Sequence, residues 1–365
     1  ALRLKERGRA DGFRLSIEPY DMTPCADMTL GTAADVPMGE FWLSGFHTAH
    51  AVVEAAGVAH TGGKTVVAAE AFTSDGREAW RAHPASMKAL GDWALAAGVN
   101  RVVFHRYQHQ SGTPPEPGLT MGPYGVHWER TQTWWDMVPA YHEYLARCQF
   151  LLRRGAPVAD VLFLAAEGAP HVFRPPAGAL RGDPPGPASY AFDGCPPETL
   201  RASAAVENGR IVFPGGASYA VLVLPERETM TLALLAKIRD LVAAGATVVG
   251  PRPRKSPSLS GFPACDAEVA RLAGEIWGDI DGERVTERAF GRGRVVWDRR
   301  GADPGPSGRI APVGAGSSRS DPPTGGEDVW RVGAPPLDEP RQYGDFAVVA
   351  DTLAKAPREL RQLAV

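Results

Sequence analysis

Short apolar runs alternate with helical patterns through the first 150 residues of the chain. The clearest run is the stretch KTVVAAEAFTS at residues 64–74, in which a single carboxylate, Glu70, interrupts small and β-branched residues. A nearly continuous apolar run predicts a strand that is buried on both faces. A carboxylate at the end of such a strand is costly unless it is paired or used. Glu70 is therefore either a satisfied structural acid or a functional group.

Other strands and helices follow the same alternation. Strands are predicted at residues 13–17 and 101–107 and, more weakly, at 28–34. Helices are predicted where apolar residues recur at spacings of three and four, at residues 48–60, 84–97 and 131–154. This order is typical of parallel β/α units.

Polar side chains recur where these apolar runs end. Glu18, Glu40, Glu70 and His105 each lie at or just past the C-terminal end of a run. Catalytic side chains gather at this edge in a β/α barrel, and ligands bind at the same edge of an open doubly wound sheet. The pattern predicts a functional site at the C-terminal ends of the strands, but it does not distinguish a β/α barrel from an open doubly wound sheet.

The pattern changes at residue 157, so the predicted domains are residues 1–156, 157–300 and 301–365. The second domain is predicted to be α/β, with strands at 158–165, 219–224, 246–249 and 293–297 and helices at 231–244 and 266–277. Residues 168–197 are predicted to form a Pro/Gly-rich loop. Residues 301–365 are predicted to be a low-complexity linker and tail, because little apolar surface is available there to offset chain entropy.

Composition and charge exclude several classes of partner. The net charge of -3 gives no reason to expect nucleic acid or an anionic membrane. No apolar run approaches the roughly 18 residues of a membrane span, and no signal-like leader opens the chain. The four cysteines have no CxxC spacing, which argues against zinc and against a disulfide scaffold. Localisation and oligomeric state are left open, although secretion would suit a longer form of the protein.

Histidine and tryptophan are concentrated in the first half of the chain. All nine histidines lie between His47 and His171, and six of the nine tryptophans precede Asp136. Sugars stack their apolar faces on rings and need hydrogen-bond partners for their hydroxyls, so this mixture favours carbohydrate binding. The candidate substrate-binding residues are His47, His105, Tyr107, Trp128, Glu129 and Trp134. Trp134 and Trp135 are adjacent on a predicted helix, so one of them is expected in the core.

Three glutamates are the candidates for catalysis. Hydrolysis of a glycosidic bond needs two carboxyl groups, one as acid and the other as base or nucleophile. Glu70, Glu40 and Glu18 are candidates by their positions at strand ends. A metal site is only weakly indicated and its ligands cannot be assigned. Cys195 is disfavoured as a nucleophile because two prolines follow it and its domain has no histidine further along the chain.

Four segments carry a family resemblance. In order and spacing, the chain resembles glycoside hydrolase family 106, the α-L-rhamnosidases, through ADVPMGEFW, GKTVVAAEAFTS, GVNRVVFHRYQHQ and TMGPYGVHWERTQTWWDMVPAYHEYLARCQFLL. The resemblance covers roughly residues 10–300. It implies part of a (β/α)8 TIM-type barrel followed by a flavodoxin-like or amidotransferase-like α/β domain. It also implies inverting hydrolysis of terminal α-L-rhamnose, assisted by a calcium ion.

Carried onto this chain, the resemblance implies that Glu70 is the general base on the seventh barrel strand. The strand at residues 13–17 would then be about the fifth, so we expect a fragment of a longer enzyme that lacks the first strands and the C-terminal β modules. Glu18 and Glu40 both stay open as the general acid, which this chain could also lack. The alternative is a non-catalytic carbohydrate-binding fragment. An amidotransferase-like enzyme is disfavoured because residues 157–300 contain no Cys–His pair placed for catalysis.

Overall fold

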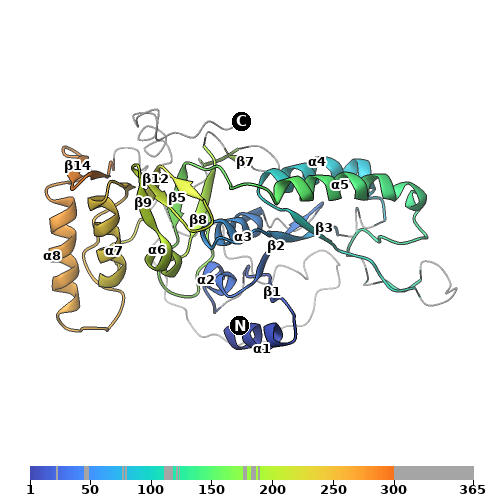
Figure 1. Cartoon of the computed structure of the whole chain (residues 1–365), viewed down its shortest axis with the longest axis horizontal. Coiled ribbons are helices and arrows are strands. Elements are labelled where there is room, and N and C mark those ends of the chain that lie inside the picture. Colours follow the sequence, from blue (N-terminus) through green and yellow to red (C-terminus); the bar gives the residue numbers. More distant parts are fainter. Residues whose placement is uncertain are drawn as a thin grey trace, which may run out of the picture.

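A computed structural model describes residues 1–299 apart from 22–23, 45–48, 76–77, 79, 111–117, 121, 123, 176–178, 182–185 and 188–189. The expectations for His47 and for residues 301–365 therefore lie outside the described residues. The predicted α/β class with parallel sheets is confirmed. Figure 1 shows an elongated molecule with α4 and α5 at one end and α7 and α8 at the other.

The first sheet is parallel throughout and runs in chain order. Its strands are β1 (Ser16–Ile17), β2 (Val36–Trp42), β3 (Ala68–Thr73) and β4 (Arg101–Phe104). The helices of this part are α1 (Leu2–Ala10), α2 (Asp27–Thr32), α3 (Ala49–Thr61), α4 (Pro84–Ala96) and α5 (Val138–Leu152), with the 3₁₀ turn η1 (Trp135–Met137) before α5. Because the strands are parallel, their C-terminal ends, each of which leads into a helix, all lie at one edge of the sheet.

The second sheet has the order β14-β15-β13-β12-β5-β8 and is parallel except for its β14 edge. Its strands are β5 (Val161–Leu164), β8 (Phe192–Cys195), β12 (Val221–Val223), β13 (Thr247–Val249), β14 (Glu287–Phe290) and β15 (Gly293–Val296). The helices α6 (Pro197–Ser203), α7 (Leu232–Ala243) and α8 (Cys265–Trp277) belong to this part. Short antiparallel ribbons complete it: β9 (Ala205–Glu207), β10 (Arg210–Val212) and β11 (Ser218–Tyr219), and β6 (Leu180–Arg181) with β7 (Gly186–Pro187).

Three local predictions are corrected. The strand predicted at residues 28–34 is the helix α2, because a short apolar run does not by itself distinguish strand from helix, and Asp27 supplies the acid that favours a helix start. The helix predicted from residue 131 begins at Val138, where Pro139 suits the first turn. The loop predicted at residues 168–197 contains β8, whose sequence FDGC has no apolar run and whose place is set by pairing with β5.

Helix α3 packs against both sheets, on β2 of the first and β8 of the second (Figure 1). Glycine makes this approach feasible. A Cβ on Gly57 of α3 would lie 2.5 Å from the carbonyl oxygen of Gly194 in β8. A Cβ on Gly39 of β2 would lie 2.6 Å from the carbonyl oxygen of Ala51 in α3. Larger side chains at these positions would force the helix away from the strands, so the glycines determine how the two parts of the chain meet.

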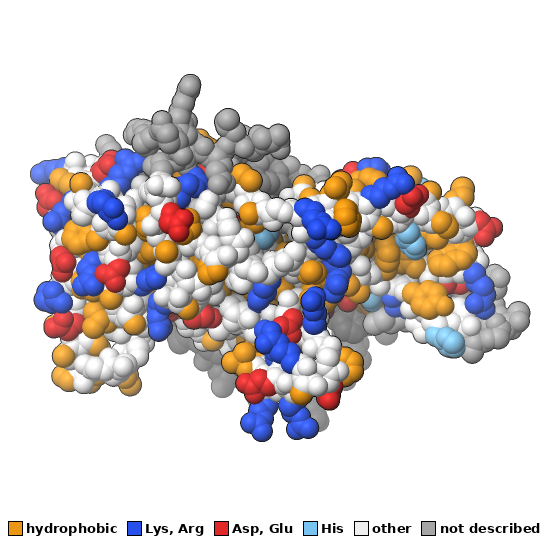
Figure 2. Space-filling view, in the orientation of Figure 1, with side chains coloured by type: hydrophobic (Ala, Val, Ile, Leu, Met, Phe, Trp, Pro, Cys, Tyr) orange, Lys and Arg blue, Asp and Glu red, His pale blue; other side chains and the backbone are white. Residues whose placement is uncertain are grey.

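The cores of the two parts differ in character. The first core is aromatic: Phe41 meets Phe72 edge to face at 5.1 Å between ring centroids, and Trp128 meets Trp134 at 5.3 Å. The second core is mainly aliphatic, with Trp277 as its largest fully buried side chain. Figure 2 also shows hydrophobic side chains at the surface around α4 and α5. The aromatic residues of the first part therefore serve mainly its own packing.

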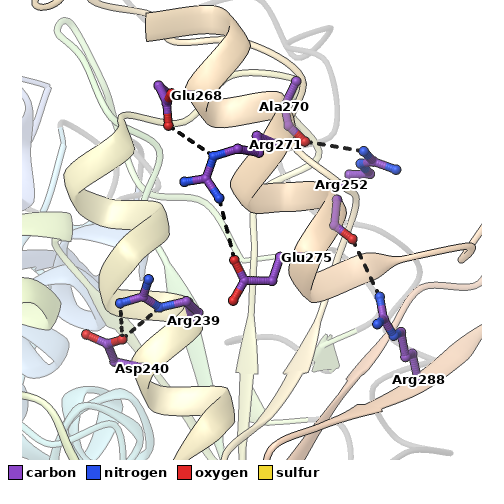
Figure 3. Close-up of polar contacts among 9 residues, drawn as sticks. Arg239, Asp240, Arg252, Glu268, Ala270, Arg271, Glu275 and Arg288 are labelled. Carbon is purple, nitrogen blue, oxygen red and sulfur yellow. Dashed lines mark hydrogen bonds and ion pairs between the residues drawn. The ribbon is translucent and has the colours of Figure 1, made fainter.

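Charged side chains pair along the exposed faces of α7 and α8 (Figure 3). Arg271 forms ion pairs with Glu268 at 3.1 Å and Glu275 at 3.8 Å. Arg252 donates to the carbonyl oxygen of Ala270 near the middle of α8, and Arg288 donates to that of Gly274 in its last turn. Exposed pairs of this kind contribute roughly 0.2–1 kcal/mol each, and arginines near a helix C-terminus complement its dipole. These contacts stabilise the outer helices locally.

The contact between the two parts contains a buried polar network whose effect on stability is testable. Asp193 on β8 accepts hydrogen bonds from Tyr219 Oη at 2.8 Å and from His60 Nδ1 on α3 at 2.9 Å. Burial is the largest single influence and lowers the pKa of His60, but the charge of Asp193 and its hydrogen bond together outweigh burial, so the net pKa is raised. The stabilisation is therefore complete below the unfolded histidine pKa of about 6.5 and is lost as pH rises through the folded value.

We expect Asp193→Asn to lower the free energy of unfolding at pH 6 by about 3 kcal/mol, because it breaks a buried charge pair. The wild type should lose stability between pH 6 and pH 9, and the variant should lose less of it. Urea denaturation at both pH values measures this. Asp240→Asn is the control, because among the described residues Asp240 forms only an exposed ion pair with Arg239 on α7, and such pairs contribute little to stability. An unchanged pH dependence in Asp193→Asn would show that the pair is not responsible.

Candidate active site

Three glutamates meet on one face of the first sheet, toward its C-terminal edge. Glu40 in β2 and Glu70 in β3 are direct partners in the parallel register, so their side chains lie side by side on the same face. Glu18 directly follows β1, which pairs with β2 on the other side. The pKa of Glu18 is raised to about 7, first by burial and then by the charges of Glu70 and Glu40. The structure thus brings together all three of the carboxylates predicted to be catalytic.

Glu40 is held rigidly at the centre of this group. Its side chain is 5% exposed and accepts hydrogen bonds from Trp42 Nε1 at 2.5 Å, from Thr73 Oγ1 at 3.3 Å and from Tyr20 Oη. Burial is the largest cause that raises the pKa of Glu40, and the Tyr20 hydrogen bond opposes it. Because these donors fix both carboxylate oxygens, Glu40 is well placed to orient a ligand or to supply fixed negative charge.

Glu70 is the more accessible carboxylate. Its side chain is 30% exposed, and its Oε1 lies 3.8 Å from Nε2 of His105, the residue that follows β4. Burial raises the pKa of Glu70, and the nearby hydroxyl of Thr73 offsets part of this rise. Burial and then the charge of Arg106 lower the pKa of His105, so this imidazole is neutral near pH 7. Glu70 can therefore accept a proton from a water molecule, with His105 beside it.

The other predicted substrate-binding residues take different positions. Tyr107 is 65% exposed just beyond His105. Trp128 and Trp134 are 2% and 9% exposed and pack in the aromatic core, and their contact with substrate stays a prediction. Glu129 is buried and accepts hydrogen bonds from the backbone and hydroxyl of Thr131, which stabilise a turn. His47 is outside the described residues.

Sequence reasoning did not single out Tyr20, Trp42 or Arg106, whereas His127 belongs to the histidine-rich set that favours carbohydrate binding. Tyr20 and Trp42 donate to Glu40. Trp42 could have been found, because residues i and i+2 of a strand point to the same face. Arg106 and His127 are buried beside His105, and burial and then the charge of Arg106 lower the pKa of both histidines. No sequence pattern connects Arg106 with His127, since the chain folds back over 20 residues to place them together.

The described residues include no group of three or more His, Cys, Asp or Glu side chains arranged to hold a metal ion. Their donor set does not fit the expected calcium ion, which stays a prediction. Cys195 is fully buried, and burial raises its thiol pKa, which does not suit a nucleophile. Across the described segments, no helix has the length and apolar character needed to cross a membrane.

Two cavities lie away from the carboxylates. A groove of about 690 Å³ runs between the first halves of α4 and α5, lined in part by Trp80, Trp134 and Tyr144. A second cavity of about 460 Å³ lies where α3 and the end of α5 meet the second sheet. Neither is lined by Glu18, Glu40 or Glu70. The chemistry of the carboxylate edge, rather than cavity size, therefore identifies the candidate site.

Comparison with known proteins identifies relatives of this chain. Residues 6–304 match the alpha-L-rhamnosidase family, glycoside hydrolase family 106. A protein of Formosa agariphila named "Putative beta-glucuronidase" is 39% identical over 269 residues, which are 73% of this chain and 22% of that protein. The structure of a rhamnosidase from Novosphingobium sp. PP1Y superposes with a TM-score of 0.71 at 29% identity, over 81% of this chain and 28% of the other. The chain thus spans about a quarter of the length of these relatives.

Proposed function

This chain belongs to the alpha-L-rhamnosidase family of glycoside hydrolases, and we propose that its carboxylate edge hydrolyses terminal α-L-rhamnose in carbohydrates. The observation that carries the proposal is the convergence of Glu18, Glu40 and Glu70 with unequal surroundings. When the surroundings of two carboxyl groups give them different pKa values, one can act as the general acid and the other as the general base.

We assign Glu70 as the general base and Glu18 as the general acid. Glu18 has a pKa raised to about 7, so it still carries a proton near neutral pH and can give it to the glycosidic oxygen. Glu70 accepts a proton from water, which attacks the anomeric carbon from the opposite face. Glu40 is fixed by three donors between them and supplies negative charge to the oxocarbenium-like transition state.

Strand spacing supports an inverting pair. Neighbouring strands lie roughly 4.8 Å apart, so the backbones of Glu18 and Glu70, on strands separated by β2, are roughly 10 Å apart. Inverting enzymes hold their two carboxyl groups roughly 6.5–9.5 Å apart, leaving room for a water molecule. Glu40 and Glu70 are direct neighbours in register and leave less room.

The strand order supports part of a β/α barrel. Four parallel strands in chain order, each followed by a helix and with polar side chains at their C-terminal ends, are what a segment of such a barrel contains. We propose residues 1–156 as this segment and residues 157–300 as an α/β accessory domain, with residues 301–365 as linker and tail. The proposed activity belongs to the carboxylate edge, either as this segment holds it or as further barrel strands of a longer protein complete it.

The test is the release of products from two aryl glycosides. We expect the protein to cleave an aryl α-L-rhamnoside and to leave an aryl β-D-glucuronide, the bond named for the relative from Formosa agariphila, intact. Proton NMR during the first turnovers should show β-L-rhamnose, the product of inversion. Cleavage of the glucuronide alone would refute the substrate assignment. Binding of rhamnose in calorimetry without turnover would favour the alternative, a carbohydrate-binding fragment that does not catalyse.

A further inference from the structure

Arg106 is a buried cation with an unused hydrogen-bonding edge. Its side chain is 8% exposed, and its Nη1 donates to the side-chain oxygen of Gln108. Nε and Nη2 are buried and have no hydrogen-bond partner among the described residues. Burial alone lowers its pKa, since no carboxylate among the described residues pairs with it. A buried guanidinium without a counter-ion is energetically unfavourable. An anion that is not among the described residues would therefore stabilise Arg106.

The two unpartnered nitrogens have a particular geometry. Nε and Nη2 lie along one side of the planar guanidinium, where their N–H groups point in parallel. This edge binds the two oxygens of a carboxylate or sulfate side by side, and such bidentate pairs are stronger than single neutral hydrogen bonds. The vacant edge of Arg106 therefore matches an anion better than a lone hydroxyl.

A second unpartnered group lies beside the first. His127 is 2% exposed, and within the described part of the chain its Nε2 has no hydrogen-bond partner. Burial and then the charge of Arg106 lower the pKa of His127 to about 4, so the ring is neutral near pH 7. The ring stacks on Trp80 with centroids 3.6 Å apart and planes 9° apart, which fixes its orientation. Backbone pairing holds the two residues together, since Trp128 N donates to Arg106 O at 3.0 Å.

This pair adjoins the carboxylate edge. Val126 N donates to His105 O at 3.0 Å, and Nε2 of His105 lies 3.8 Å from Glu70 Oε1. The three glutamates would repel a negatively charged ligand, whereas Arg106 would attract one at this single side of the site. Trp80, with 44% of its surface exposed, offers an adjoining ring face on which a sugar could stack.

We propose that Arg106, assisted by His127, binds an anionic substituent, a carboxylate or a sulfate ester, on the sugar to which the rhamnose is attached. This inference rests on the proposed hydrolase function. It adds a preference for acidic over neutral sugars on the leaving-group side of the bond. Arg106 is a binding residue in this scheme and takes no part in proton transfer.

The test compares three rhamnosyl disaccharides with the same linkage, in which the second sugar is glucose, glucuronic acid or sulfated glucose. The wild type should cleave an acidic substrate with a kcat/KM at least about 10-fold above that of the neutral one. In Arg106→Gln this ratio should fall about 10- to 100-fold, toward unity, and Arg106→Lys should keep part of it. Whichever acidic substrate shows the larger ratio identifies the anion. Arg81→Gln is the matched control, because Arg81 is exposed, and its ratio should equal that of the wild type.

An acidic-to-neutral ratio that Arg106→Gln leaves unchanged would overturn the anion site while leaving the hydrolase proposal intact. If the wild type cleaves none of the disaccharides, calorimetry with free glucuronate, glucose and glucose sulfate tests the anion site independently of hydrolysis. Anion binding that Arg106→Gln abolishes would then support the site although the hydrolase proposal had failed, and equal binding of all three would overturn it. Circular dichroism checks folding, and Arg106→Lys supplies the same comparison if the glutamine variant does not fold.

Discussion

Glu70→Gln is expected to slow the release of rhamnose by about 10²- to 10⁴-fold, because general base catalysis contributes that much and glutamine cannot accept the proton. Burial raises the pKa of Glu70, which means that its charged form is disfavoured in the folded state. The neutral amide should therefore leave the melting temperature at pH 7 unchanged or slightly higher. Initial rates on an aryl α-L-rhamnoside and a thermal unfolding curve measure the two effects on the same preparation.

Glu167→Gln is the matched control for this variant. Glu167 accepts hydrogen bonds from Thr231 N at 2.8 Å and Thr231 Oγ1 at 2.6 Å at the start of α7, far along the chain from the carboxylate edge. The same chemical change there should lower stability by about 1 kcal/mol and leave the rate constant of the folded protein unaltered. A normal rate in Glu70→Gln would remove Glu70 from the mechanism, whatever its stability.

The second large effect is expected in the pH dependence of kcat/KM, which should be bell-shaped. Glu18, with its pKa raised to about 7, must be protonated to act as the acid, so activity should fall as pH rises through about 7. Glu70 must be ionised to act as the base, so activity should fall on the acid side as pH drops through its raised pKa. The three glutamates interact, so the two limbs report apparent pKa values of the group.

Glu18→Gln should remove the alkaline limb, and the loss of rate should depend on the leaving group. A poor alkyl or sugar leaving group needs the proton, so its rate should fall about 10²- to 10⁴-fold. A nitrophenolate leaves readily without a proton, so its rate should fall much less. Glu40→Gln, tested alongside, should lower both rates to a similar extent and retain the alkaline limb. If the limb near pH 7 survives in Glu18→Gln and disappears in Glu40→Gln, the acid is Glu40.

Local patterns predicted the elements of the chain well where they were strong. The apolar run around Glu70 and the Ala-rich and Val-rich pattern at residues 48–60 correspond to β3 and α3 with small shifts at their ends. The weak run at residues 28–34 was misread, because a six-residue helix and a short strand look alike when both are apolar. Strand β8 was missed because its pairing with β5, rather than its own residues, makes it a strand.

By itself, the sequence determined the α/β class, the family and the placement of Glu18, Glu40, Glu70 and His105 at or near strand ends. These features follow from local periodicity and from motifs that are contiguous along the chain.

Only the tertiary structure decided how these residues meet. It placed Glu40 beside Glu70, formed the hydrogen bond from Tyr20 to Glu40 and buried Trp128 and Trp134 in the core. It also left one edge of Arg106, beside His127, without a partner among the described residues. The physical reason is that strand register and packing join residues 20 to 30 positions apart. Burial and neighbouring charge, which set the pKa values of the three glutamates, arise only once those contacts have formed.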